Sequence, residues 1–365
     1  MHIGLLLRKA EVGQRRLHLL GEQVEGAWSS MVRVVIEQEE LVGMGRSTLV
    51  YRKMGRMLMQ STVGEVNEEL GKEKGDLKAR LRGLGERRKG ARRELRGVER
   101  ELGEVEVREV SPSLVVAVSR LLERRPSLGR RGVWVGRATP TTPMLQEGPQ
   151  CGLVALAMAA AAMGEECEVE HLVTLAREQG FTMRGEMFSV ADMAELARQV
   201  LPNFEVKVEK GGRMAETQWL VDGLLAGSLL LVPYDCSADH SPGLWGGQKA
   251  HWCLVTGFLL PTSSPPPSSP LPGCPGFHLL PPGPSPGLHH RLLPSEELMV
   301  VARQGKSVLP CLWSRSALVA SCGNLRQAAA TRMDGSYVLP EGGGLQGLQG
   351  KIVLISRQGF KTNGS

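Results

Sequence analysis

The chain has 365 residues, with 44 Lys and Arg against 38 Asp and Glu, which gives a formal net charge of +6. This length is enough for one large domain with appendages. No apolar run could span a bilayer, and the short N-terminal apolar patch lacks the order of a secretory signal, which argues against membrane and secreted proteins. The seven cysteines form no CxxC pair and no regular framework. Free thiols in the cytoplasm, with no metal or cofactor, are the simplest interpretation.

The basic charge belongs to the N-terminal part, where residues 1–139 carry 28 basic and 19 acidic side chains. Basic and acidic residues are interleaved there and aromatic residues are scarce, which favours a solvated helical surface over a nucleic-acid site. Within 68–110, apolar residues recur every seven positions, which is typical of a coiled coil. Frequent glycines oppose such a helix by about 1 kcal/mol each. We expect 1–139 to be a basic region, partly helical or disordered, with no firm element over 1–65.

A cysteine stands at the start of a predicted apolar helix in the middle of the chain. Pro149 breaks any preceding structure, and residues 151–163 contain no charge before Gly164 ends the run. The first turn of a helix has unpaired backbone N–H groups and the positive end of the macrodipole, which favour a thiolate over a thiol. Cys151 is therefore a candidate nucleophile, although a cysteine in such a place is more often part of the packing.

The neighbours of this cysteine favour catalysis. Gln146 and Gln150 offer amide donors for a developing oxyanion, and Gly152 leaves room for a substrate backbone. A thiol protease needs an activated sulfur, such donors and a rigid platform.

His251 is the strongest candidate for the base that such a nucleophile needs. It follows a loop rich in Gly and Ser and enters an apolar strand at 250–260, whereas the other histidines lie in helices, flexible loops or low-complexity segments. A single His at a strand start is more often structural, but the distance from Cys151 in the sequence is no obstacle in a fold.

The rest of the chain predicts an α+β domain. Helices come first and an antiparallel sheet follows, so the cysteine lies on a helical layer that faces the histidine on the sheet. Ser189 and Asp192 resemble a helix-capping pair. Besides the helix at 151–163 and the strand at 250–260, the expected elements are helices at 169–179, 190–200 and 214–225, and strands at 204–208, 229–232, 297–303, 306–313, 336–339 and 351–356.

A proline-rich segment interrupts this domain. Residues 261–294 are too rich in Pro and Ser to form helix or sheet, and we expect a polyproline-type insertion that projects from the surface. The expected catalytic domain therefore comprises 140–260 and 295–357, followed by a tail at 358–365.

Five stretches of this sequence resemble the actin maturation proteases, a family of papain-like thiol peptidases related to the bacteriocin-leader-processing type. They are QEGPQCGLVAL at 146–156, GEMFSVADM at 185–193, VPYD at 232–235, KAHW at 249–252 and QGKS at 304–307. The resemblance covers about 145–357 and implies a papain-like fold. It also implies a cytoplasmic aminopeptidase of the omega-peptidase type that removes the N-acetylated first residue, Met or Cys, from immature actin.

Carried onto this sequence, the resemblance makes Cys151 the nucleophile, His251 its base and Gln146 the oxyanion donor. The family tends to place an acidic residue after a Leu-Trp pair, but Ser314 stands there, which leaves Asp235 or Asn324 as candidates to orient His251. Profilin is a candidate partner through the proline-rich residues 261–288.

Two other functions remain open from the sequence. One is a thiol peptidase that acts on another protein, such as a ubiquitin-like tail, and the other is a catalytically inactive binding module. No membrane or nucleic-acid partner is expected.

Overall fold

The computed structural model describes residues 2–54, 57–108, 112–125, 128, 133–263, 268–281, 285, 288, 298–333 and 335–357. The chain divides into two compact units. One, the hairpin unit, spans Arg8–Val98, and the other, the sheet unit, comprises Met1–Leu7 and Glu99–Ser365. No helix within these described ranges is long and apolar enough to cross a membrane.

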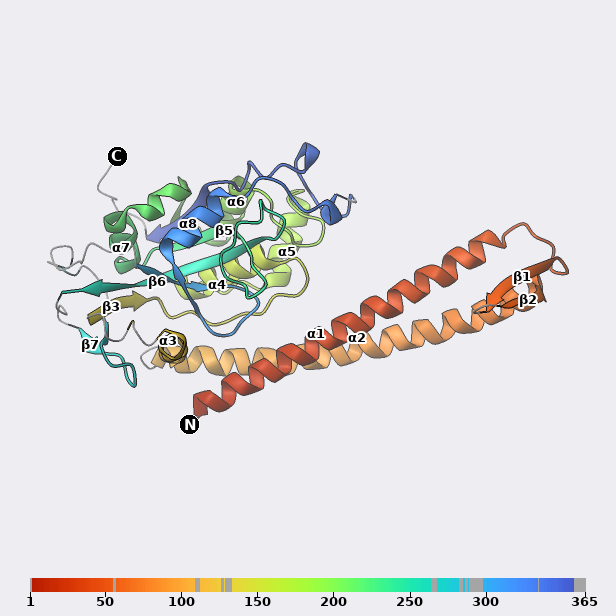
Figure 1. The fold of residues 1–365 in the computed structure, drawn as a ribbon, viewed down its shortest axis with the longest axis horizontal. Helices are drawn as coiled ribbons and strands as arrows, with labels where there is room; N and C mark the ends of the chain where they lie inside the picture. The colour runs from red at the N-terminus through yellow and green to blue at the C-terminus, as the bar shows by residue number, and fades with distance from the viewer. Residues whose placement is uncertain are drawn as a thin grey trace. The chain divides into compact units, whose positions relative to one another are not determined.

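The hairpin unit is built from two long antiparallel helices, α1 (His2–Glu40) and α2 (Val63–Arg108) (Figure 1). A β-hairpin of β1 (Leu49–Met54) and β2 (Met57–Thr62) joins them. The heptad positions Leu77, Leu84 and Ala91 are buried in this unit, so their partner is α1 of the same chain. Exposed ion pairs from Arg16 to Glu94 and from Arg33 to Glu73 also join the two helices.

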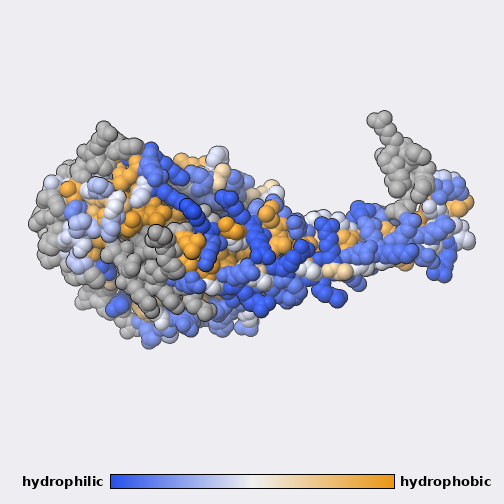
Figure 2. All heavy atoms as spheres, turned by 90° about the horizontal axis from the view of Figure 1, so that it is seen from below, coloured by the Kyte–Doolittle hydropathy of each residue, from blue (hydrophilic) through white to orange (hydrophobic). Residues whose placement is uncertain are grey.

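These helices differ from the expectation of a partly disordered region without a firm element over 1–65. The α2 glycines at 71, 75, 83, 85, 90 and 97 have open space where a side chain would stand, so they cost propensity but leave the helix continuous. Packing of an amphipathic face supplies most helical stability in proteins. The low helix propensity of the glycines therefore did not predict that α2 is continuous. The face of the pair that is seen in Figure 2 is mostly hydrophilic, in keeping with its charge.

The elements of the sheet unit follow in chain order. They are α3 (Pro112–Arg124), β3 (Val133–Ala138), α4 (Cys151–Met163), α5 (Val169–Glu178), α6 (Val190–Val200), β4 (Phe204–Lys210), a 3-10 helix (Gly211–Ala215), α7 (Thr217–Leu225), β5 (Leu229–Asp235), β6 (Ala250–Thr262), β7 (Ser269–Pro270), β8 (Phe277–Leu279), β9 (Met299–Arg303), β10 (Cys311–Ser314), α8 (Arg315–Gly323), two further 3-10 helices (Ala330–Arg332 and Glu341–Gly343) and β11 (Lys351–Arg357).

One sheet organises this unit, with strand order β4-β11-β5-β6-β3-β8-β7, while β9 pairs with β6 and β10. The longest strand, β6, pairs antiparallel with β5, β3 and β9. The sheet is mixed and not wholly antiparallel as expected, because β3 and β8 run parallel. Since β3 ends at Ala138 and pairs along β6, the folded unit begins before the expected boundary at residue 140.

Helices cover both faces of the sheet (Figure 1). Strand residues alternate between two cores, so that Leu229 and Leu231 of β5 face α4, α5 and α6, while Leu230 and Val232 face α7 and α8.

The α+β class matches the sequence-based prediction, but α3 and α8 were not predicted. Ser189 caps α6 through its hydroxyl, which accepts the Asp192 N–H at 3.2 Å. Residues 336–339 belong to the described chain and form no strand there.

The proline-rich segment contradicts the prediction of a projecting polyproline insertion. In its described part, residues 268–281, β8 joins the sheet, and Leu271, Cys274 and Phe277 are buried against α3 and β3. These three residues therefore do not project from the surface, while profilin binding at 261–288 stays a prediction. Residues 264–267, 282–284, 286–287 and 289–297 of the predicted insertion lie outside the described residues.

Truncating Phe277 tests whether this segment is part of the core. Its ring stacks on Trp134 with centroids 5.7 Å apart, and Phe277 is 1% exposed. Phe277→Ala should lower the free energy of unfolding by about 3–5 kcal/mol, measured by urea denaturation. Ser269→Ala, at an exposed position of β7, is the control. A loss below about 1 kcal/mol for Phe277→Ala would place the segment outside the core.

Candidate active site

Cys151 is the first residue of α4, and the apolar helix behind it is buried from Cys151 to Ala160. The side chain of the N-cap residue Gln150 makes no capping hydrogen bond, so the first-turn backbone N–H groups point to the site without a side-chain cap. The cysteine itself is 9% exposed. A rigid helix thus holds a thiol at the edge of the core.

Two opposing effects act on this thiol. Burial raises the pKa of Cys151, while hydrogen bonds from the backbone N–H groups of Trp252 and Gly152, together with the positive charges of Arg332 and Lys306, lower it. Burial is the larger effect, so the net pKa lies above the ordinary value and the resting side chain is a thiol. The donors and cations around the sulfur are nevertheless those that stabilise a thiolate once it forms.

Gly152 has a packing role that differs from the expected one. A Cβ atom there would lie 2.6 Å from the Met193 side chain and 3.1 Å from the Trp252 ring. The glycine therefore lets α4 approach the sheet and α6 and does not provide space for a substrate. The Trp252 indole N–H in turn donates to the Met187 carbonyl at 2.8 Å, which ties the sheet to the loop before α6.

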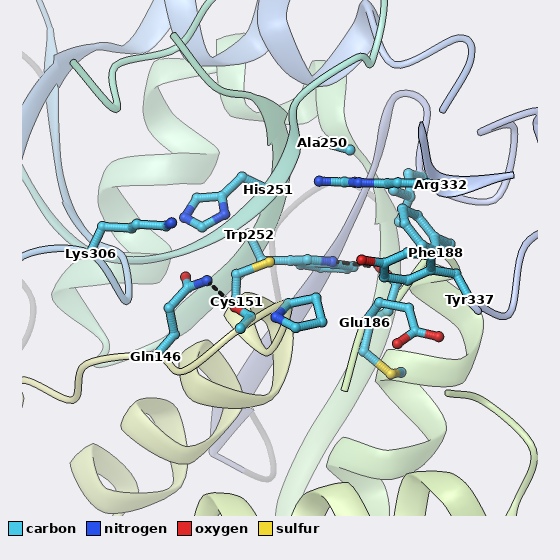
Figure 3. Close-up of a pocket in the computed structure, with 14 residues that line it drawn as sticks. Gln146, Cys151, Glu186, Phe188, Ala250, His251, Trp252, Lys306, Arg332 and Tyr337 are labelled. Atoms are coloured by element: carbon cyan, nitrogen blue, oxygen red, sulfur yellow. Dashed lines mark hydrogen bonds between the residues drawn. The ribbon is translucent and has the colours of Figure 1, made fainter. Parts of the chain in front are cut away.

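His251 is the second residue of β6, and it lines the same pocket as Cys151 and Gln146 (Figure 3). It pairs across the strands with Tyr234, whose ring meets the imidazole edge-on with centroids 5.6 Å apart. The histidine is 7% exposed, and its buried Nε2 atom has no hydrogen-bond partner in the described part of the chain. The described contacts include no hydrogen bond between Cys151 and His251.

Burial lowers the pKa of His251 from 6.5 to about 3, with a further lowering from the Lys306 ammonium. A hydrogen bond with the Gln304 side chain acts in the opposite direction. The imidazole is therefore neutral near pH 7, which is the form that accepts a proton.

Asp235 and Asn324, the expected orienting residues, lie together but serve a different purpose. The buried Asp235 carboxylate accepts backbone N–H groups of Trp245, Gly247 (2.9 Å) and Lys249 (3.2 Å), and Asn324 contacts it at 3.5 Å. Asp235 pairs with Ala250 in the sheet, so its side chain alternates to the face opposite that of Tyr234 and His251. This carboxylate shapes the loop before His251, while Gln304 is the side chain that contacts the imidazole.

Gln146 is fixed by both its backbone and its side chain. Its N–H donates to the Gly305 carbonyl at 2.7 Å, and its Nε2 donates to the Gly148 carbonyl at 2.7 Å (Figure 3). An amide nitrogen carries two hydrogens, so one N–H remains for an oxyanion. Its buried Oε1 has no partner among the described residues.

The pocket has a volume of about 150 Å³, with Cys151 and His251 in its wall. Two cations, Lys306 and Arg332, also line it (Figure 3). Arg332 lies over the Phe188 ring at 5.6 Å. Sequence reasoning missed both cations, and it also missed Gln304 as a contact of the imidazole.

Glu186 also lines the pocket, but its carboxylate is hydrogen-bonded to backbone N–H groups. Burial raises the pKa of this carboxyl. The carboxylate also accepts hydrogen bonds from the backbone N–H groups of Met183, Arg184 and Val338, and together these lower its pKa below the ordinary value. The carboxylate therefore ties the loop before α6 to residue 338.

No group of three or more His, Cys, Asp or Glu side chains able to hold a metal ion occurs within the described ranges. All seven cysteines are free thiols.

Comparison with known proteins supplies the family. The family model described as "Actin maturation protease-like, C-terminal domain" matches residues 141–259. Proteins named actin maturation protease align with the chain at 36% identity in Mus musculus, 35% in Danio rerio and 37% in Homo sapiens. The alignments cover 66%, 64% and 66% of this chain, and 69%, 78% and 71% of the respective relatives. No solved structure matches. These relatives place the chain among proteases. The chain belongs to the actin maturation protease family.

A second family model, described as "Prefoldin subunit", matches residues 6–105. This range coincides with most of α1, the β-hairpin and α2. The hairpin unit therefore resembles a different family from the sheet unit.

Acid lability tests the burial of neutral His251. Below pH 6.5 the unfolded chain binds a proton at this residue, whereas the folded chain does so only near pH 3. Stability should therefore fall as the pH drops through this window, by up to about 1.4 kcal/mol per pH unit from this group. His251→Gln should flatten the slope in urea unfolding measured between about pH 6.5 and 4.5, while exposed His171→Gln should retain it. Equal slopes in wild type and His251→Gln would show that His251 is not buried neutral.

Proposed function

We propose that this chain is a papain-like cysteine aminopeptidase, of the omega-peptidase type, that removes the N-acetylated first residue, Met or Cys, from immature actin. Cys151 is the nucleophile, His251 the base and Gln146 the oxyanion donor. The single observation that carries the proposal is the convergence of these three side chains on one pocket, with the thiol at a helix start (Figure 3). The relatives named actin maturation protease supply the substrate class. Seven free cysteines agree with a reducing compartment such as the cytoplasm.

The reaction follows from these groups. The neutral His251 takes the Cys151 thiol proton while the sulfur attacks the carbonyl carbon of the first residue. Gln146 donates its free N–H to the resulting oxyanion. The C–N bond then breaks, the leaving amine takes the proton from the imidazolium, and an N-acetylaminoacyl thioester remains on Cys151. Water, deprotonated by His251, hydrolyses this thioester and releases the N-acetylated amino acid.

The size of the pocket supports removal of a single residue. Pockets for drug-sized ligands usually have about 300–1,000 Å³. The pocket at Cys151 has about 150 Å³, which suits one side chain with its acetyl group better than an extended peptide.

Replacing the nucleophile should abolish turnover. Cys151→Ala removes the group that forms the thioester, so cleavage of an N-acetylated actin peptide, followed by mass spectrometry of the products, should fall at least about 10⁴-fold. Cys167→Ala changes a half-buried thiol between α4 and α5, outside the pocket, and should keep wild-type turnover. Turnover by Cys151→Ala at the wild-type rate would disprove the cysteine mechanism.

The two pocket cations should select acidic substrates. Arg332→Gln should raise KM by about 3- to 10-fold for a peptide with Asp in the second position, because it removes a charge that would face that carboxylate. The same peptide with Asn should show little change. Exposed Arg326→Gln is the matched control. An equal KM increase for both peptides would mean that Arg332 acts by shape and not by charge.

A further inference from the structure

We propose that Gln304 is the residue that positions His251, so that a side-chain amide, and not a carboxylate, holds the base. The inference rests on the proposed function, because it assigns the third member of the same site. It differs from the expected role of Asp235 or Asn324, whose polar groups are used in the loop before β6.

Strand pairing explains why Gln304 reaches His251. Gln304 directly follows β9, whose last residue, Arg303, pairs with Leu254 of β6. Because the strands are antiparallel, residues after 303 run alongside residues before 254, which brings this turn to the start of β6. Gln304 is 1% exposed and hydrogen-bonds the His251 side chain.

The amide of Gln304 has a fixed orientation. Its Oε1 accepts the Lys306 backbone N–H at 2.7 Å. Burial raises the pKa of the Cys311 thiol to about 11, whereas a hydrogen bond with the Gln304 side chain lowers it. A donor to sulfur has this effect, so the amide N–H of Gln304 faces Cys311. The second lone pair of Oε1 is then the group that faces the imidazole, and it accepts a ring N–H.

This arrangement selects one tautomer of His251. One ring nitrogen donates its N–H to Gln304, so the other nitrogen keeps its lone pair. The nitrogen that keeps its lone pair is then the atom that takes the Cys151 proton. Lys306, His240 and Arg332 oppose protonation of the ring, and Tyr234 packs against it edge-on.

The same turn also supports the oxyanion donor. The Gly305 carbonyl accepts the Gln146 backbone N–H at 2.7 Å, and a Cβ atom on Gly305 would lie 2.9 Å from the Gln146 Cβ. Residues 304–306 thus hold His251 on one side and Gln146 on the other, and Gly305 is required because the two segments approach closely.

Alkylation of Cys151 tests this role without any substrate, so the result is independent of whether actin is cleaved. The rate of iodoacetamide labelling at Cys151, read by peptide mass spectrometry from about pH 5 to 9, reports the thiolate. Gln304→Glu is isosteric and places a carboxylate behind the ring, which stabilises the imidazolium and its partner thiolate. Labelling at about pH 6 should rise about tenfold or more over wild type. Gln349→Glu, at an exposed position, should follow the wild-type profile. A folded Gln304→Glu protein with an unchanged profile would overturn the proposal.

A measurement on the wild-type protein covers the case in which the Gln304→Glu substitution impairs folding. ¹⁵N NMR of histidine-labelled protein, with the His251 signal assigned by its loss in His251→Gln, should show a single neutral tautomer at about pH 7. A mixture of the two tautomers would show that no side chain fixes the ring and would overturn the proposal. In turnover, Gln304→Met should lower kcat by about 10- to 100-fold with KM within about twofold, because it frees the ring without changing the pocket wall. A KM effect alone would assign Gln304 a structural role and overturn the proposal.

Discussion

The site depends on the fully buried packing of α4 against the sheet. Residues 151–160 of this helix are buried, and Gly152 brings the helix start within contact of Trp252 and Met193. Because the helix cannot tilt without losing this packing, the Cys151 sulfur is fixed beside the backbone N–H groups of Trp252 and Gly152. A larger residue at position 152 would displace Cys151 by colliding with Met193 and Trp252.

The other half of the site comes from strand pairing. Antiparallel pairing of β6 with β5 and β9 brings three chain segments, at 234–235, 250–252 and 303–306, together at one end of these strands. One face of that end carries His251, with Tyr234 beside it and Gln304 behind it. Burial keeps the imidazole neutral, which is the form that a base needs. Because a neutral ring cannot form an ion pair, a hydrogen bond has to hold it in place.

Local patterns predicted the elements with strong periodicity, because helix and strand signals lie within a few residues of each other. The helix at 190–200 and its Ser189 cap are examples. Long-range features escaped this reasoning. The proline-rich composition concealed that Phe277 packs on Trp134, and the glycines of α2 concealed a helix that α1 stabilises. Cys151, His251 and Gln146 carried local signals. Gln304 lies in the QGKS stretch at 304–307, but its contact with His251 follows from the register of β9 on β6, which that stretch alone does not predict.

The central claim is covalent catalysis by Cys151, and the most direct test is to trap its thioester. Wild-type protein mixed with an N-acetylated actin peptide and quenched in acid during turnover should gain the mass of the N-acetylated first residue, with the adduct mapped to Cys151 by peptide mass spectrometry. Turnover with no adduct on Cys151, or with the adduct on another of the seven cysteines, would contradict the account.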